Sequence, residues 1–154
     1  MISFEQPMFR PPSEANSLLV QATVGCSHNS CTYCAMYRQS NQKFRMRSEK
    51  EILQIIAENS SSSYEKAFIA DGNALVLPVK LLVKTIKTIY ESNQNVRQVS
   101  IYGNVGDILR KKPQELKELA AAGLDMVYIG FESGDDITLK RIKKGANKSK
   151  TIQS

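Results

Sequence analysis

The chain has 154 residues, of which 42% are hydrophobic and 23% are charged, and its formal net charge is +6. This composition is typical of one globular domain, and no apolar run approaches the ~18 residues of a membrane span, so we expect a soluble protein with no membrane partner. The excess positive charge lies between Lys140 and Lys150, where no acidic residue occurs. Since no aromatic residue interleaves there, this segment indicates a solvated surface, and we expect no nucleic-acid partner.

Short apolar runs alternate with amphipathic stretches in the first half of the chain. Residues 18–24 are predicted to form a first strand. A helix then begins at Ser48, where Glu51 completes a capping box. Residues 67–70 form a short second strand. The apolar residues that this helix is expected to bury are Ile52, Leu53, Ile55 and Ile56.

The same alternation continues to the end of the chain. Pro78 lies in the first turn of a helix that ends near Asn93, and strand 99–102 follows. Pro113 begins a helix that Gly123 ends, and strand 126–131 precedes a last helix at 135–144, before Gly145. The residues expected to face inward are Leu81, Leu82, Ile86 and Ile89 in one helix, and Leu116, Leu119 and Ala120 in the next.

Four strand–helix units in strict alternation predict βαβ crossovers and a parallel sheet in an α/β fold. Polar residues follow each strand, and the carboxyl ends of parallel strands meet at one rim, where ligands bind. The turn-forming preference of Gly, Asn, Asp and Ser explains any one of these loops, but four such loops on one rim favour a ligand-binding site. The rim residues are Gly25 and Cys26, Asp71, Gly72 and Asn73, Tyr102, Gly103 and Asn104, and Glu132, Ser133 and Gly134.

Cys26, Cys31 and Cys34 are the only cysteines, and they lie in one short run. Three thiolates this close can converge on one metal centre but leave a fourth position unfilled. No secretory signal precedes them, which argues against a disulfide and for a reducing cytoplasm. A zinc site that includes His28 remains an alternative by count, although we interpret His28 as a loop residue and not a ligand.

Four segments in order resemble the radical SAM superfamily. The cysteine loop, residues 25–37, has an aromatic residue, Tyr33, directly before Cys34, as that superfamily has. The commonest first gap there has three residues, whereas this loop has four, a spacing shared with a group labelled Fe–S oxidoreductase. The other segments that carry the resemblance are residues 10–17, 70–74 and 128–134.

The resemblance implies a cofactor and a role for each rim residue. Cys26, Cys31 and Cys34 would ligate three irons of a [4Fe–4S] cluster, and S-adenosylmethionine (SAM) would chelate the fourth. Asp71, Gly72 and Asn73 would receive the methionyl ammonium, the backbone near Tyr33 would face the adenine, and Glu132 would accept hydrogen bonds from the ribose. Further candidates for SAM or substrate are Ser100, Tyr102 and Asn104; no catalytic residue is assigned.

The resemblance also implies reductive cleavage of SAM, with an external low-potential electron donor and radical chemistry on an unknown substrate. A noncatalytic Fe–S or zinc-binding module is the alternative. The expected fold is a partial (β/α) barrel of about four units where the superfamily has six, so the chain looks truncated, with a C-terminal half or a second chain missing. We divide it into an N-terminal extension (1–16), a partial radical SAM core (17–145) and a basic tail (146–154).

Overall fold

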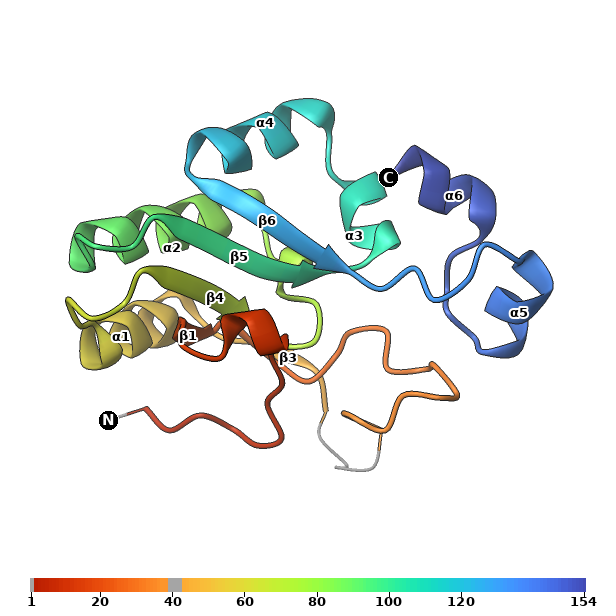
Figure 1. Ribbon diagram of the computed structural model, residues 1–154, viewed down its shortest axis with the longest axis horizontal. Coiled ribbons are helices and arrows are strands. Elements are labelled where there is room, and N and C mark those ends of the chain that lie inside the picture. Colours follow the sequence, from red (N-terminus) through yellow and green to blue (C-terminus); the bar gives the residue numbers. More distant parts are fainter. Residues whose placement is uncertain (1, 39–42) are drawn as a thin grey trace.

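The computed structural model describes residues 2–38 and 43–154, so the first residue of the predicted N-terminal extension lies outside it. The core is a four-stranded parallel sheet in the order β1-β4-β5-β6. Figure 1 shows the strands side by side, with their carboxyl ends pointing the same way. The predicted α/β fold of four strand–helix units is therefore confirmed. The strands are β1 (Leu18–Gln21), β4 (Lys66–Ala70), β5 (Gln98–Gly103) and β6 (Leu124–Ile129).

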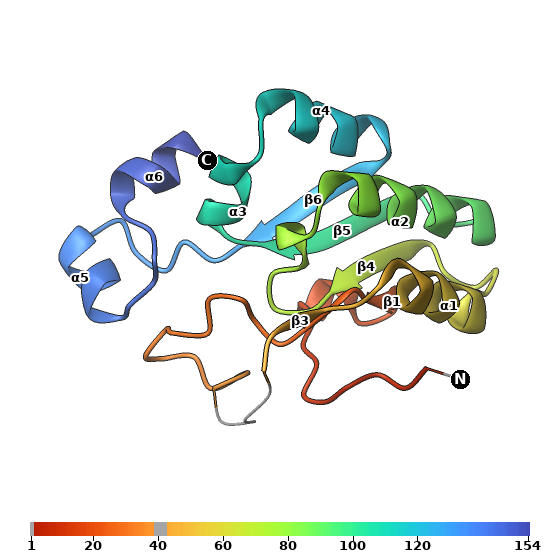
Figure 2. The ribbon, with the colours of Figure 1, turned by 180° about the vertical axis from the view of Figure 1, so that it is seen from behind.

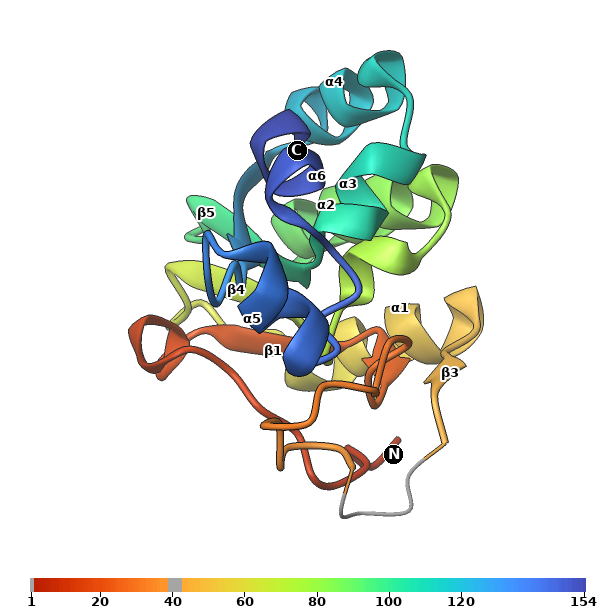
Figure 3. The ribbon, with the colours of Figure 1, turned by 90° about the vertical axis from the view of Figure 1, so that its right-hand side faces the viewer.

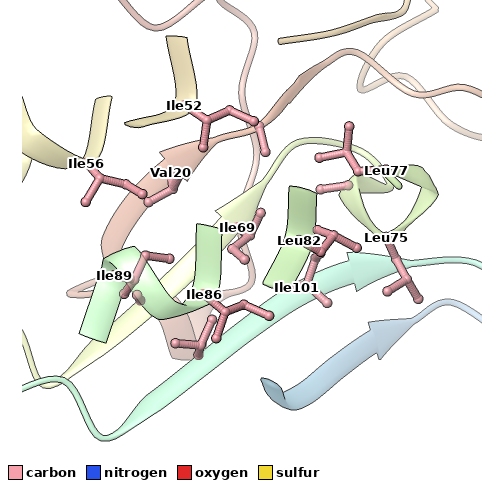
Figure 4. Close-up of a cluster of buried hydrophobic side chains, with 14 of the residues drawn as sticks. Val20, Ile52, Ile56, Ile69, Leu75, Leu77, Leu82, Ile86, Ile89 and Ile101 are labelled. Carbon is pink, nitrogen blue, oxygen red and sulfur yellow. The ribbon is translucent and has the colours of Figure 1, made fainter. Parts of the chain in front are cut away.

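Three helices cover one face of this sheet, as the views from behind and from the side show (Figure 2, Figure 3). They are α1 (Glu49–Asn59), α2 (Val79–Ser92) and α4 (Pro113–Ala121). Ile52 and Ile56 of α1 and Leu82, Ile86 and Ile89 of α2 face the sheet and are fully buried, whereas Leu53 and Leu81 are partly buried (Figure 4). Burial of each such side chain contributes about 1.5–3 kcal/mol, which makes this layer the main source of stability. Within the described residues, no helix is both long and apolar enough to cross a membrane.

The helix ends follow the predicted signals in most cases. The Ser48 hydroxyl oxygen accepts the Glu51 N–H (3.3 Å) and a Glu51 oxygen accepts the Ser48 N–H (2.8 Å), which confirms the capping box of α1. Pro78 is the N-cap of α2 and not part of its first turn. In α4, Leu119 is buried as predicted, but Ala120 is exposed. The prediction for Ala120 was wrong because that position lies on the solvent face of the helix.

The predicted first strand, 18–24, is divided at Ala22. The Ala22 N–H donates to the Ala70 carbonyl of β4 (2.5 Å), whereas the Ala22 carbonyl accepts the N–H of Arg47 (3.0 Å). Beyond it, β2 (Thr23–Val24) leaves the main sheet and pairs antiparallel with β3 (Arg45–Met46). This two-stranded ribbon forms the base of the cysteine loop.

The C-terminal elements differ in detail from the prediction. Strand β6 begins two residues earlier than expected because Asp125 belongs to it, its carboxylate accepting the Val99 N–H (2.9 Å) and the Tyr90 hydroxyl (3.0 Å). The last predicted helix, α5 (Asp136–Arg141), ends before Lys144. Two short helices were not predicted: α3 (Val105–Arg110) after β5, and α6 (Lys148–Gln153) within the basic tail.

The end of the N-terminal segment lies against the sheet face that the helices leave open (Figure 1). A 3₁₀ turn at Pro12–Glu14 brings the fully buried Glu14 to this face. Its carboxylate accepts the Tyr128 hydroxyl (2.8 Å) and the Ser17 hydroxyl (2.5 Å). Tyr128 also stacks edge-on with Phe68, at a ring-centroid distance of 6.0 Å. The segment named an extension is thus packed against the sheet.

Candidate cofactor-binding site

A cavity of about 380 Å³ lies at the carboxyl ends of the strands. This volume is in the range of small-molecule sites, and the position is where α/β folds bind their ligands. The cysteine loop and α5 both lie beyond these strand ends (Figure 1). The cavity wall combines residues of the cysteine loop with residues at or after the ends of β4, β5, β6 and α5, so five parts of the sequence meet there.

All three cysteines line this cavity, are free thiols and are partly exposed. Burial raises the pKa of Cys31, against the opposing effect of the Lys144 ammonium. Among the residues that the structure describes, no three His, Cys, Asp or Glu side chains come close enough to hold a single metal ion. The thiols therefore share one cavity without forming a site for one ion.

The residues that follow α5 support the cysteine loop from behind. The Thr32 N–H donates to the Ile142 carbonyl (3.0 Å), and His28 Nε2 lies 2.8 Å from the Lys143 carbonyl. A carbonyl can only accept, so Nε2 carries the proton. Gly145, at φ +80°, packs against the same ring, and a Cβ there would lie 2.6 Å from His28 Cε1. His28 thus serves as a contact between loop and C-terminal segment.

The three residues after β4 have different positions. Gly72 and Asn73 line the cavity, but Asp71 is fully buried behind its wall. The Tyr37 hydroxyl and the Gly72 N–H donate to Asp71 Oδ1, while Oδ2 has no hydrogen-bond partner among the described residues. Burial raises the pKa of Asp71. The side chain of Asp71 therefore supports the wall, and Tyr37 is a neighbour that the sequence did not reveal.

Asn73 connects the cysteine loop to α3. Its amide oxygen accepts the Ser27 N–H (3.0 Å), and its Nδ2 donates to the Ser27 hydroxyl (2.7 Å) and to Asp107 Oδ2 (3.0 Å). The other oxygen of Asp107 pairs with Arg110 (2.5 Å), whose guanidinium lines the cavity. Asp107 and Arg110 were missed, although Asn104 with an acid three residues later is a capping pattern that could have predicted α3.

The residues after β6 and α5 place charge on the far wall. Glu132, which has a φ of +62°, accepts a hydrogen bond from Lys144 Nζ (3.0 Å). Burial acts to raise the pKa of Glu132, but the hydrogen bonds from Tyr33 and Lys144 outweigh it and lower that pKa. Glu132 is therefore an anion at neutral pH. Tyr33, Glu132 and Lys144 all line the cavity.

The strand β5 candidates divide between the wall and the interior. Tyr102 and Asn104 line the cavity, and the Asn104 side chain also caps α3 by accepting the Asp107 N–H (2.9 Å). Ser100 is fully buried within the sheet, where its hydroxyl accepts a hydrogen bond from Gln98 (3.2 Å). The structure thus brings most of the predicted rim to one cavity, but Gly25, Asp71, Ser133 and Gly134 are not among the residues that line it, and neither is the further candidate Ser100.

Comparison with known sequences identifies a family and two curated relatives. The model of the Radical SAM superfamily matches residues 20–154. A "Probable GTP 3',8-cyclase" of Methanococcus maripaludis strain C6 is 26% identical over 135 residues, which are 87% of this chain and 42% of that protein. The protein of the same name from strain S2 is 27% identical over 118 residues, which are 76% of this chain and 37% of that protein. The chain thus spans about two fifths of these relatives.

Comparison with solved structures gives the same fold. Two structures of the cobalamin-dependent S-adenosylmethionine radical enzyme OxsB each match 87% of this chain and 21% of that chain. The structure with aqua-cobalamin and S-adenosylmethionine bound has a TM-score of 0.60 at 22% identity. The structure with aqua-cobalamin bound has a TM-score of 0.63 at 19% identity. At this identity the likeness concerns the fold of the shared part.

Proposed function

Since the chain belongs to the radical SAM superfamily, we propose that it provides the [4Fe–4S] cluster loop and a large part of the SAM site of a radical SAM enzyme. The observation that carries the proposal is the position of the thiols. Cys26, Cys31 and Cys34 come from one loop and line one cavity at the carboxyl ends of a parallel sheet.

The donor set fits a cluster better than zinc. Ligands of one tetrahedral zinc ion, with Zn–S bonds of about 2.3 Å, lie ~3.8 Å apart. In a cluster, each thiolate binds a different iron, so the sulfurs lie further apart. The engagement of His28 with the Lys143 carbonyl supports the cluster over a zinc site that includes His28.

We assign the residues of the cavity wall to SAM as follows. Gly72 and Asn73 offer backbone carbonyls to the methionyl ammonium, while Asp71 supports Gly72 from behind. Glu132 is an anion and can accept two hydrogen bonds from ribose hydroxyls. The backbone near Tyr33 faces the adenine. Arg110 and Lys144 are cations on the cavity wall and suit a carboxylate. Asn104 and Tyr102 remain for SAM or substrate, and Ser100 acts from behind the wall.

When bound, the reduced cluster supplies an electron that cleaves SAM to methionine and a 5′-deoxyadenosyl radical. The chain's own part is to orient SAM and to exclude water from the cavity. A low-potential electron donor and a substrate are required in addition. The curated relatives carry the name "Probable GTP 3',8-cyclase", so GTP is the first substrate to assay with this protein. The alternative is a metal-binding module without turnover. Reconstitution of the cluster and an assay of SAM cleavage distinguish the two.

Anaerobic reconstitution with iron and sulfide tests the cluster directly. We expect a single oxygen-labile [4Fe–4S] cluster per chain, measured by iron and sulfide content and by absorption. Replacing Cys26, Cys31 or Cys34 by alanine should abolish it. His28→Ala is the control in the same loop and should keep the iron content of the parent chain. Stoichiometric zinc without iron, or loss of iron from His28→Ala, would contradict the assignment.

A further inference from the structure

A buried carboxylate lies behind the cysteine loop. Asp107 is 1% exposed and faces donors only: Asn73 Nδ2 (3.0 Å), the Asn104 N–H (3.1 Å) and the guanidinium of Arg110 (2.5 Å). Asn73, also 1% exposed, is the only one of these three with a hydrogen bond to the cysteine loop among the described residues. A single carboxylate therefore joins α3, the end of β4 and the loop.

The chemistry of these groups fixes which way the Asn73 amide points. An ionised carboxylate can only accept hydrogen bonds, so the NH₂ group of Asn73 must face Asp107. Its carbonyl oxygen is then turned to the Ser27 N–H, at 3.0 Å. In the flipped orientation, two oxygens would face each other and NH₂ would face N–H. The Asp107 carboxylate and the Ser27 N–H thus require the same orientation of the amide, and Asp107 holds the NH₂ end of it.

We propose that Asp107 is a positioning residue of the cluster loop, which acts through Asn73 to hold the Ser27 N–H. Ser27 directly follows the cluster ligand Cys26, so this N–H belongs to the peptide that leaves that ligand. While Asn73 accepts it, the N–H is not directed at the cluster sulfurs. Hydrogen bonds to those sulfurs tune the reduction potential. Asp107 therefore contributes to the potential without touching the cluster, a consequence that rests on the proposed function.

Two substitutions at position 107 distinguish the role of Asp107 as a hydrogen-bond acceptor for Asn73 from its role as a negative charge. Asp107→Leu removes one of the groups that hold the Asn73 amide, so its hydrogen bond to the Ser27 N–H should weaken and open more often. Asp107→Asn keeps an amide oxygen for Asn73 and turns its NH₂ toward Arg110, which is 66% exposed and free to move away. Asp107→Asn should therefore retain the hydrogen bond to Ser27.

The first measurement uses the metal-free chain and does not depend on the proposed function. By NMR, hydrogen exchange of the Ser27 amide should become about five- to tenfold faster in Asp107→Leu, as for a lost hydrogen bond, and stay near the parent rate in Asp107→Asn. The control is Glu115→Leu, which removes the equivalent capping carboxylate of α4, bonded to the Lys112 N–H (2.7 Å). It should leave Ser27 unchanged. If Asp107→Leu does not fold, Asp107→Ala serves as the smaller variant.

The second measurement is the midpoint potential of the reconstituted cluster. In Asp107→Leu the Ser27 N–H, which is free more often, stabilises the reduced, more negative cluster, so the potential should rise; in Asp107→Asn and Glu115→Leu it should not. An unchanged Ser27 exchange rate in Asp107→Leu would overturn the proposal. So would an exchange rate that Asp107→Leu and Asp107→Asn increase by the same factor. A chain that shows the exchange effect but takes up no cluster would contradict the proposed function and leave the positioning role intact.

Discussion

Gly72 is the residue at which the sheet and the cysteine loop come closest. A Cβ at this position would lie 2.8 Å from Cys26 Cβ, 2.8 Å from the Gly25 carbonyl oxygen and 2.9 Å from Cys26 Cα. These atoms belong to backbone or lie next to it, so they cannot move aside as a flexible side chain would. The position therefore excludes every side chain while Cys26 keeps its place.

Gly72→Ala should displace Cys26 and weaken cluster assembly. Overpacking of this kind costs about 1–3 kcal/mol, and here the strain falls on a ligand. After anaerobic reconstitution we expect the iron content of the variant to be well below that of the parent chain. Gly134→Ala is the matched control, because nothing lies within 4 Å of a Cβ there. Equal iron content in both variants would show that the loop tolerates the displacement.

The sequence revealed residues whose chemistry is local and missed those whose role depends on packing. The cysteine loop and the rim positions Asn73, Asn104 and Glu132 follow from spacing and strand ends. The buried position of Asp71 could not be read, because it depends on Tyr37, a residue 34 positions away. Asp107 and Arg110 were missed because they lie in a six-residue helix, too short for apolar periodicity to show.

At the scale of single elements, α1 depends on its first turn. The Ser48 N–H lowers the pKa of Glu51 to about 2, against a smaller effect of burial, with help from the Ser48 hydroxyl and Arg45. Because this folded-state pKa is below the unfolded value of about 4.3, the carboxylate stabilises the fold above that pH. The contribution is lost as the pH falls through about 2.

Glu51→Ala should therefore destabilise the chain by about 1 kcal/mol at pH 7, and by progressively less as the pH falls below about 4. Urea unfolding at several pH values measures both effects. Lys50→Ala, an exposed change in the same helical turn, should have little effect at any pH. A loss of stability that is the same at pH 7 and at pH 3 would show that the charge of Glu51 does not matter.

Long elements were predicted well and short ones poorly, for a physical reason. α1 and α2 carry several turns of apolar periodicity, and strands β4 and β5 are buried runs of apolar residues. Helices and strands of this length therefore leave a clear hydrophobic pattern in the sequence. β3 is two exposed residues, and β2 was absorbed into the first strand because the change of partner at Ala22 leaves no mark in hydrophobicity. Whether such short strands form depends on pairing between segments that are distant in the sequence.

For the whole molecule, the arrangement of parallel strands was predictable, whereas the path of the N-terminal segment was not. Alternating units prescribe a parallel sheet. Glu14 meets Tyr128 across 114 residues, and nothing near Glu14 in the sequence announces that contact. β6 is an edge strand of the sheet, and the chain spans 42% of the first curated relative. The edge position of β6 and the partial coverage of the relative both bear on the SAM-cleaving activity that we expect of this chain.

We expect SAM to bind to the reduced, reconstituted chain but to be cleaved slowly. The wall residues are present, yet a radical needs enclosure, and this chain spans about two fifths of the length of its curated relatives. SAM should perturb the EPR signal of the cluster while little 5′-deoxyadenosine forms. Glu132→Ala should weaken the perturbation. A version with the length of the relatives should cleave SAM much faster.

Either of two results would contradict this expectation. Cleavage of SAM over many turnovers by the 154-residue chain would show that the length of the chain does not limit the reaction. An EPR signal that SAM leaves unchanged would show that these wall residues do not form a SAM site.

The contacts of the cysteine loop also set an order of events in the cell. The loop leaves the ribosome before Asn73, which accepts the Ser27 N–H, and before the carbonyls of Ile142 and Lys143, which bind Thr32 and His28. At about 5–20 residues per second, the thiols wait several seconds for the last of these partners. During that interval they are unprotected and open to oxidation. For the proposed cluster, we therefore expect metal delivery to follow synthesis of the C-terminal segment, as a late, post-translational step.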